Sequence, residues 1–589
     1  MTLQPKWQTM CEALLHLENC TRYGARFITR SGNPTLYPYH EVLQRAQAVA
    51  GTLQYQRLAV GDRVAIILPT SIQFLDAFLG TQLAGGIPAA LYPPLRLGRL
   101  TEYFTRTRRM LTKIGARFLI TESRIRKLIG PAIAGVPSLE RVFDAEELHT
   151  SASWNLVKLH PDTPAFLQFS SGTTLEPKAV IVSHASLLYN LEMMDSLLHH
   201  FDDTAAEQGG VCWLPLYHDM GLVGCMFVGL YHPGTVTYLG PELFLAKPSM
   251  WLQTLARYRA VISPAPNFAY GLCLAKIKDA EMEGIDLSNW QIAFNGAEPI
   301  DTGVLHRFAE RFARWGFRPE ALTPVYGLAE AGLAVTFSDP WSPPKVSEFD
   351  RQSLSERGEA ILGTGRSLPA VGRPLPDMRV EIRDKHDRRL DQGKVGRIMI
   401  QGPSITMGYY NEPELTAQTI RHGWLDTGDL GFFYQGELYI TGREKDLIII
   451  RGRNYAPQEI EELLAGVQGL RVGCAVAVGH WKDGLGEQLL ILAERDIRVN
   501  RPREEIVTEI QERILSGISL VPDRVEILEP GTLPRTSSGK LRRWDALHMF
   551  LSGRLIPPKK MGMLKLVKEL GKSQIAWVYF RVRGKLLKH

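Results

Sequence analysis

Residues 166–184 read FLQFSSGTTLEPKAVIVSH, and this stretch determines how the rest of the chain is interpreted. An apolar strand runs into Ser170-Ser171-Gly172-Thr173-Thr174, which is followed by Lys178 and a second strand, Val180–Val182. Hydroxyl groups, exposed backbone N–H groups and a lysine cation together suit the binding of a polyphosphate. The stretch is not a Walker loop, because a strand follows it in place of a helix. The alternative is an ordinary hairpin loop rich in Ser and Thr.

The residues that precede this loop alternate helical and strand patterns. Their periodicity predicts helices at 39–53 and 72–83 and buried strands at 62–68 and 116–121. Strands separated by helices indicate a mostly parallel sheet. The same pattern predicts two further strands at 260–263 and 291–294.

After residue 370 the sequence changes character. Residues 378–383 (MRVEIR) and 395–401 (VGRIMIQ) alternate with period two, which predicts antiparallel strands with one wet face. Residues 443–550 predict a small strand–helix domain that is attached through a hinge near Lys445. Residues 338–372, rich in Pro, Ser, Arg and Glu, predict a long loop or insertion with a short helix at 352–357. Long loops in compact domains are often functional.

The predicted small domain contains a regular set of elements. Within it, strands are expected at 446–450, 475–478, 488–493 and 524–528, and helices at 456–464 and 503–515. One more strand is expected at 437–441, just before the hinge.

Four further motifs carry side chains with chemical roles. In Val325–Glu330 (VYGLAE), Tyr326 is suited to stacking on a purine and Glu330 to holding Mg²⁺. Trp424–Asp429 (WLDTGD) places two carboxylates around a Gly turn, which suits ribose hydroxyls. Residues 442–446 (GREKD) form a charged turn, and residues 533–543 (LPRTSSGKLRR) place Lys540 after a small loop. Taken singly, these motifs also fit a buried aromatic with a solvated acid, an Asx-turn and two solvated surface loops.

Together, in this order, the five motifs resemble the adenylate-forming superfamily of acyl-CoA synthetases, luciferases and peptide-synthetase adenylation domains. Residues 213–222 (WLPLYHDMGL) and 294–299 (FNGAEP) add to the resemblance, which covers about residues 20–550. It implies an α/β chain with a large N-terminal domain of mixed sheets and helices at 1–442, a small mobile α+β lid at 443–550, and a tail at 551–589.

The details of the motifs are most similar to fatty acyl-AMP ligases. The segments that carry this similarity are QFSSG at 168–172, YHDMGL at 217–222 and DLIIIRGRNY at 446–455. That subgroup carries an insertion after the YGLAE motif, where residues 338–372 stand here, and the insertion is understood to restrict domain motion. The subgroup passes its acyl-AMP to the phosphopantetheine thiol of an acyl carrier protein, or of a carrier domain in a polyketide or peptide synthase.

The resemblance implies a reaction in which a fatty acid carboxylate attacks the α-phosphorus of ATP, with Mg²⁺ as a cofactor. Catalysis would then consist of positioning and charge stabilisation. Lys540 would reach the carboxylate and the α-phosphate, Glu330 would hold Mg²⁺, and His218 would sit by the acyl carboxylate. A structural histidine is the alternative for His218. The residues expected to bind ATP are Ser170, Ser171, Gly172, Thr173, Thr174, Lys178, Gly296, Ala297, Glu298, Tyr326, Gly327, Asp429 and Arg443.

Other functions remain open at this point. A fatty acyl-CoA ligase on the same fold differs in its acceptor thiol. A non-catalytic protein that binds acyl groups or nucleotides would not need Lys540, Glu330, Asp429 and Arg443 together. A tail that binds membrane or RNA would show steep salt dependence.

The amino-acid composition argues against some classes of protein and some cellular compartments. The formal charge of +6 is uneven, because residues 551–589 hold ten Lys/Arg and a single acid, Glu569. The body therefore lacks the basic field expected of a nucleic-acid binder. Six scattered cysteines with no CxxC pair favour a reduced, cytoplasmic protein. The longest apolar run, 220–231, is too short to cross a bilayer.

The basic tail interleaves apolar residues, which predicts peripheral contact with anionic lipid or with an acidic carrier. A solvated extension is the alternative.

Overall fold

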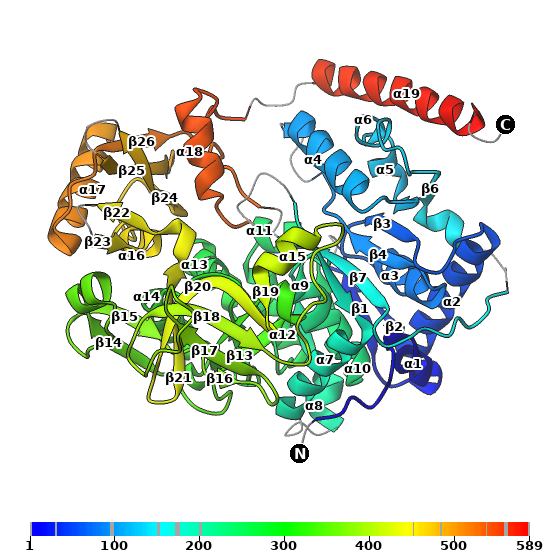
Figure 1. Ribbon diagram of the computed structural model, residues 1–589, viewed down its shortest axis with the longest axis horizontal. Coiled ribbons are helices and arrows are strands. Elements are labelled where there is room, and N and C mark those ends of the chain that lie inside the picture. Colours follow the sequence, from blue (N-terminus) through cyan, green and yellow to red (C-terminus); the bar gives the residue numbers. More distant parts are fainter. Residues whose placement is uncertain are drawn as a thin grey trace.

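The computed structural model describes residues 3–29, 32–94, 99–149, 153–170, 177–198, 203–450, 453–482, 486–536, 539–558 and 563–586. Three sheet regions with their helices form a large body, a smaller strand–helix unit sits beside it, and a final helix lies across the top of the body (Figure 1). The mixed α/β class expected from the sequence is confirmed.

The first sheet has six strands and is parallel except for its last pair. Its strands, in spatial order, are β6 (Arg141–Asp144), β5 (Phe118–Thr121), β3 (Arg63–Ile67), β4 (Ile87–Ala90), β7 (Pro164–Phe169) and β8 (Ala179–Ser183). Val64 and Ile66 of β3 pack into one core cluster and Ala65 and Ile67 into another, so the strand is buried on both faces. That burial explains its unbroken apolar sequence.

Helices cover both faces of this sheet. On one face α2 packs against α3, and on the other α4 contacts α6. The helices of this region are α1 (Met10–Leu15), α2 (Tyr39–Tyr55), α3 (Ile72–Leu83), α4 (Leu100–Lys113), α5 (Ser123–Arg126), α6 (Gly130–Ile133) and α7 (His184–Leu198). The predicted helices at 39–53 and 72–83 are thus confirmed. Ser71 caps α3, where its side chain accepts a hydrogen bond from the Phe74 N–H.

The second sheet region is built from two four-stranded sheets. Isolated bridges from Gly210 through Ile262 to Ile292 connect them. The strands are β2 (Pro34–Pro38), β1 (Gly24–Ile28), β10 (Val236–Leu239) and β9 (Gly210–Cys212), then β11 (Ala293–Asn295), β12 (Leu322–Gly327), β13 (Ala334–Phe337) and β16 (Arg373–Pro374). The strand predicted at 260–263 is wrong, since only single bridges form there. The segment still hydrogen-bonds on both sides, because the Val211 N–H donates to the Ile262 carbonyl and the Ser263 N–H donates to the Ile292 carbonyl.

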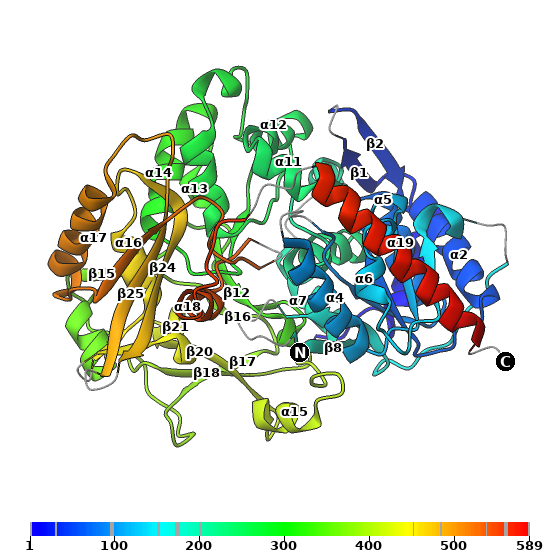
Figure 2. The same ribbon diagram turned by 90° about the horizontal axis from the view of Figure 1, so that it is seen from above.

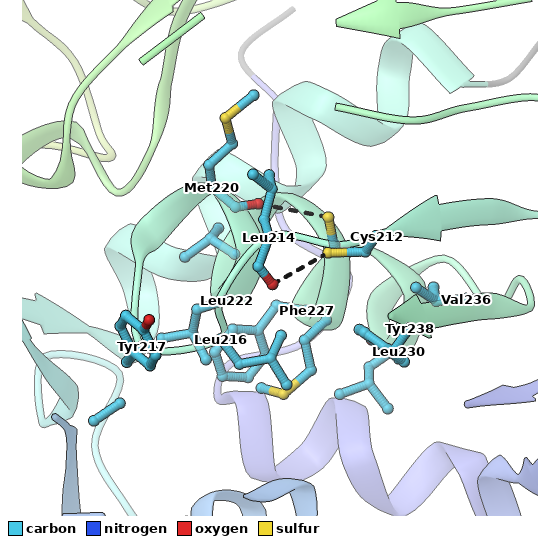
Figure 3. Close-up of a cluster of buried hydrophobic side chains, with 14 of the residues drawn as sticks. Cys212, Leu214, Leu216, Tyr217, Met220, Leu222, Phe227, Leu230, Val236 and Tyr238 are labelled. Atoms are coloured by element: carbon cyan, nitrogen blue, oxygen red, sulfur yellow. Dashed lines mark hydrogen bonds between the residues drawn. The ribbon is translucent and has the colours of Figure 1, made fainter. Parts of the chain in front are cut away.

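Short helices surround this second region. They are α8 (Asp203–Gln208), α9 (Asp219–Gly221), a π-helical segment η4 (Leu222–Phe227), α10 (Val228–Tyr231), α11 (Pro241–Ala246), α12 (Ser249–Tyr258), α13 (Asn267–Lys276) and α14 (Thr302–Phe312). Beneath α9 and η4 the apolar side chains of the 213–222 motif form a packed cluster, which fixes the turn that carries His218 (Figure 3).

The insertion at 338–372 is not the long loop expected from its composition. It forms a β-hairpin of β14 (Val346–Asp350) and β15 (Gly365–Pro369), with a π-helical turn η9 (Ser353–Arg357) between the strands. Phe349 is fully buried among Leu368, Phe432 and Tyr439. A small core of its own therefore holds the hairpin on the third sheet.

The third sheet is antiparallel, as the period-two pattern predicts. It contains β17 (Arg379–Arg383), β18 (Gly396–Gln401), β20 (Trp424–Tyr434), β19 (Ile420–Arg421) and β21 (Glu437–Arg443), with α15 (Pro413–Thr419) beside it. Residues Glu444–Asp446 form a short helical turn directly after β21. The chain leaves the large body at this turn.

The smaller unit has its own buried cluster around Ile460, Ile491, Ile510 and Ile514. Its elements are β22 (Ile448–Ile450), β23 (Arg453–Tyr455), α16 (Pro457–Leu463), β24 (Leu470–Lys482), β25 (Gly486–Arg495), α17 (Arg503–Ile518), β26 (Arg524–Leu528) and α18 (Arg543–Leu551). The strands and helices predicted here are confirmed, with longer bounds for β24, β25 and α17.

The tail forms the 24-residue helix α19 (Met563–Leu586). Figures 1 and 2 both show it lying along α4, α5 and α6, and Phe580 is buried there. These helices belong to the first subdomain, which we define as the six-stranded first sheet together with the helices that cover it. A purely solvated extension is therefore wrong for the described part of the tail. Among the residues that the structure describes, none of the helices combines the length and apolar character needed to cross a bilayer.

Candidate active site

A cavity of about 510 Å³ lies where the large body meets the smaller unit. Its walls come from strand ends and loops far apart in the sequence, including Ser170, His218, Tyr326, Arg443 and Lys540. The motifs singled out in the sequence therefore converge on one space.

One end of the cavity lies between the end of β7 and the start of β8. Ser170 and Lys178 both line it, and the Ser170 N–H donates to the Lys178 carbonyl at 2.9 Å, which closes the base of the loop. The Lys178 ammonium lies 5.3 Å from the ring centroid of Tyr409. Ser171, Gly172, Thr173 and Thr174 lie outside the described residues.

Glu330 lines the cavity beside Tyr409. The Tyr409 hydroxyl donates to Glu330 Oε1 at 2.9 Å. Burial raises the pKa of Glu330, and the Tyr409 hydrogen bond works against that rise. A carboxylate in this setting gains from a nearby cation, which would restore its charged form.

Asp429 binds two residues of the cavity wall. The Tyr326 hydroxyl donates to Asp429 Oδ2 at 2.7 Å, and Arg443 Nε donates to Oδ1 at 2.8 Å. The Asp429 charge holds the pKa of Arg443 above its usual range. Asp429 does not itself line the cavity, whereas its neighbours Thr427 and Gly428 do.

The 294–299 motif lies beside β12, because β11 pairs with that strand. Ala297 lines the cavity and has a φ of 67°, a left-handed conformation that is unusual for a residue with a side chain. A Cβ on Gly296 would lie 2.9 Å from the Val325 carbonyl oxygen, so only glycine fits there. Glu298 accepts a hydrogen bond from the Phe268 N–H at 2.6 Å at the start of α13. Gly296 and Glu298 are not among the cavity-lining residues.

His218 and Asp219 form a pair at the cavity wall. His218 Nδ1 lies 2.6 Å from Asp219 Oδ1. Burial would raise the pKa of Asp219, but the charge of His218 and its hydrogen bond outweigh it and lower that pKa to about 2. Gln168 of β7 stabilises the turn that carries His218, because its Nε2 donates to the Tyr217 carbonyl at 3.1 Å.

Lys540 enters the cavity from the smaller unit. Its N–H bonds to Thr536 Oγ1 and its carbonyl accepts from the Thr536 N–H, so the loop that carries it is closed on itself. Burial lowers the pKa of Lys540, and the charges of Asp219 and Glu298 oppose that shift. A half-buried cation near carboxylates is suited to binding a second anion.

The other end of the cavity is apolar. It begins near His218 and is lined by Met194, Gly224, Val228, Ile262, Leu333 and Phe337. Gly224 belongs to the π-helical segment η4, and a Cβ there would lie 3.0 Å from Leu333 Cδ2. π-Helical turns are rare and often occur at functional sites.

Two contributors to the site had no signal of their own in the sequence. Tyr409 reaches Glu330 because a bridge pairs it with Val180 on β8. Asp219 lies inside a motif already singled out, but its pairing with His218 depends on the turn. Gly327, which was expected here, also lines the cavity.

Comparisons with known proteins agree with this geometry. The family model described as AMP-binding enzyme matches residues 18–410. The medium-chain fatty acid acyl-carrier-protein ligase JamA of Moorena producens is 32% identical, over 88% of this chain and 90% of its own. A 4-hydroxyphenylalkanoate adenylyltransferase of Mycobacterium marinum is 33% identical, over 89% and 88%. A structure from a study of fatty acyl-adenylate ligases of E. coli and L. pneumophila superposes with a TM-score of 0.87 at 32% identity, covering 94% of this chain and 99% of that one.

Proposed function

The chain belongs to the AMP-binding enzyme family, and we propose that it activates a fatty acid with ATP to acyl-AMP and then transfers the acyl group to a carrier-protein thiol. The observation that carries the proposal is the position of Lys540. This lysine belongs to the smaller unit, yet it lines the same cavity as Ser170, Tyr326 and Arg443.

In the first half-reaction a carboxylate oxygen attacks the α-phosphorus, and the bond to the bridging oxygen of pyrophosphate breaks. No protein nucleophile is required. The obstacle is the approach of two anions, so the protein contributes position and positive charge. Lys178 lies at the loop end of the cavity, where the β- and γ-phosphates would bind. Lys540 serves the reacting carboxylate and the α-phosphate. Arg443 and Asp429 hold the wall that faces the ribose.

Mg²⁺ is part of the proposal through Glu330. The described residues contain no group of three metal-ligating side chains. A magnesium ion commonly uses one or two carboxylates together with substrate phosphates. The half-buried Glu330 carboxylate, which lines the cavity, fits that role. When bound, the ion neutralises phosphate charge.

The apolar end of the cavity supports a chain-like acyl group. Met194, Val228 and Leu333 offer no polar partner in that direction, and burying methylene groups there is favourable. JamA is named for medium-chain fatty acids, which supports the same substrate class here.

The acceptor in the second half-reaction is proposed to be the phosphopantetheine arm of a carrier protein. JamA is named as an acyl-carrier-protein ligase. The insertion hairpin supports this choice over CoA. Arg351 lies 3.2 Å from Glu459, and Glu356 lies 2.8 Å from Arg453, so the hairpin holds the smaller unit where Lys540 enters the cavity.

We also propose a second role, peripheral contact of the tail with an anionic membrane. Ile575, Val578 and Tyr579 are between 61% and 73% exposed on the face of α19 that points away from the body. Lys568 and Lys572 are exposed beside them. An apolar stripe flanked by cations suits an acidic bilayer surface. Co-sedimentation of the full chain with phosphatidylglycerol vesicles, compared with Ile575→Asp, tests this role. Equal pelleting of the two proteins would exclude it.

Separating the half-reactions tests the main proposal. ATP-dependent release of pyrophosphate with a fatty acid and no thiol should be seen first. A phosphopantetheinylated carrier protein should then be acylated, and CoA should react slowly. Rapid formation of acyl-CoA would favour the acyl-CoA ligase alternative. No pyrophosphate with any acid would favour a non-catalytic binding protein.

A further inference from the structure

The C-terminal helix is docked on a part of the protein to which it is not adjacent in the sequence. The buried Ser573 Oγ accepts from the Gly130 N–H at 3.0 Å. Trp577 Nε1 donates to the Arg126 carbonyl at 2.9 Å. Phe580 is buried and belongs to the core cluster on the α4–α6 side of the first sheet. Helix α19 is therefore anchored to the first subdomain by hydrogen bonds and by apolar burial.

Gly130 is shaped for this contact. A Cβ added there would lie 2.4 Å from the Ser573 carbonyl oxygen and 2.6 Å from Ser573 Oγ. Gly130 does not have a positive φ, so its own backbone conformation does not require glycine. The close approach of α19 is what excludes a side chain at this position.

Pro558, the last described residue before α19, lies against the smaller unit. The ring of Pro558 lies 3.5 Å from the point where a Cβ on Gly531 would be. Four residues separate Pro558 from Met563, the first residue of α19. Five steps of about 3.3–3.6 Å give a reach of at most about 18 Å. While Pro558 stays against Gly531 and α19 stays docked on the first subdomain, the chain between them limits their separation to this reach of about 18 Å.

The same side of the smaller unit also touches the first subdomain directly. Arg99 Nη2 donates to the Thr532 carbonyl at 3.0 Å. Arg542, on the smaller unit, lies 3.9 Å from Glu102 of α4. These contacts and the short tether act together, and all of them belong to the arrangement in which Lys540 lines the cavity.

We propose that α19 is an internal strap. Docked on α5 and α6, it holds the smaller unit in the position that inserts Lys540. It must leave this surface, or the Pro558 contact must open, before the smaller unit can turn away. The inference rests on the proposed function only in assigning the held position to adenylation and the released one to acyl transfer.

Distance measurements on the full chain test the strap without any substrate. Five of the six cysteines are buried, so Cys20→Ser leaves a background for labelling. Tyr55→Cys and Val521→Cys place probes on residues that are 78% and 59% exposed, one on each side of the strap. With the strap intact, molecules whose smaller unit has turned away from the first subdomain should make up about a tenth of the total or less. We call these molecules the displaced population.

Two variants break the docking from opposite sides. Gly130→Val acts on the first subdomain and Trp577→Ala acts on α19. Each should raise the displaced population about fivefold or more. Gln574→Ala is the matched control, because this side chain of the same helix is exposed. A chain that ends at Pro558 should behave like the docking variants, and it serves as the test if either substitution prevents folding.

Unchanged distances in the truncated chain would overturn the strap. So would an equal change in Gln574→Ala. If the distances shift as expected but no variant releases pyrophosphate, the strap stands and the proposed function fails. If function is confirmed, loss of docking should slow adenylation several-fold and leave acyl transfer no slower than in the unmodified chain.

Discussion

Asp429 and Arg443 are direct cross-strand partners on β20 and β21, and Arg443 Nε donates to Asp429 Oδ1 at 2.8 Å. The second oxygen of the same carboxylate binds the Tyr326 hydroxyl. One acid therefore fixes both an aromatic ring and a cation at the cavity wall. Because the carboxylate is only 9% exposed while the arginine is 43% exposed, the acid is the fixed member of the pair.

Replacing this acid should weaken nucleotide binding. Asp429→Asn keeps the shape of the side chain but removes the charge that positions Arg443. Hydrogen bonds to charged groups contribute about 1.5–3 kcal/mol each, so kcat/KM for ATP should fall by about 10–10²-fold. Steady-state pyrophosphate release measures it. Asp279→Asn, which breaks an exposed pair with Arg311, is the control and should change little. A normal KM for ATP in Asp429→Asn would exclude this role.

Lys540 should dominate the adenylation step. Lys540→Ala removes the cation that the smaller unit brings to the cavity. Loss of one charge-stabilising donor typically costs about 10²–10³ in rate. Single-turnover formation of acyl-AMP is the measurement. Lys482→Ala, an exposed lysine of the same unit, should retain the rate of the unmodified protein. Near-normal adenylation without Lys540 would remove it from the mechanism.

The dependence of kcat/KM for adenylation on pH should reflect the protonation of Lys540. Burial lowers the pKa of Lys540 below its ordinary value of 10.5. The cation exists below this lowered pKa and is lost as pH rises through it. The kcat/KM for adenylation should therefore decline on the alkaline side before pH 10.5 is reached. Lys540→Arg should move this decline upward, because arginine stays protonated. The same alkaline limb in both proteins would assign it to another group.

Sequence patterns anticipated the elements whose burial is regular. The run RVAII of β3 is buried on both faces, as its unbroken apolar sequence predicts. The alternation in β18 correctly predicts a strand, but its wet face is wrong, because Ile398, Met399 and Ile400 are all buried. The hairpin of β14 and β15 was missed, since VSEFD and GRSLP show no such periodicity. Its order comes from Phe349, which packs on residues of the third sheet. Distant packing of this kind leaves no local signal.

The residues of the candidate site also fall into two groups, those that sequence motifs identify and those that only the structure reveals. Lys540, Tyr326 and Arg443 are recognisable because each lies in a motif with a characteristic spacing. Tyr409 is not, since it reaches Glu330 through pairing between strands far apart in the chain. The docking of α19 was equally hidden. The basic composition of the tail indicates a charged surface, whereas Gly130 and Ser573 give no sign of their contact.

The apolar end of the cavity should set the length of the acyl chain. A side chain at Gly224 would point toward Leu333, because its Cβ would lie 3.0 Å from Leu333 Cδ2. Gly224→Ile should fill this space, so kcat/KM should fall for long acids and change less for short ones. A series of acids assayed by pyrophosphate release measures the shift. Gly224→Ala should give an intermediate profile. An equal loss for every chain length would indicate general damage to the fold.

Glu462 on α16 should make stability depend on pH. Burial raises its pKa to about 7, and the charges of Asp301 and Glu459 add to this rise, while Arg366 opposes it. The ordinary value for an unfolded chain is about 4.3. The folded protein therefore holds a proton that the unfolded chain releases between about pH 4.3 and 7. Stability from this group is fully present below that window and is lost as pH rises through it.

Glu462→Gln keeps the neutral form of this side chain at every pH. The variant should melt at a higher temperature than the unmodified protein at pH 8, and the difference should be much smaller near pH 4.5, at the lower end of the window, where only part of the unfolded chains have released the proton. Thermal unfolding at a series of pH values measures this difference directly. Glu505→Gln, an exposed acid on the neighbouring helix α17, is the matched control and should show no such trend. A difference that is the same at pH 4.5 and pH 8 would mean that Glu462 does not take up a proton on folding.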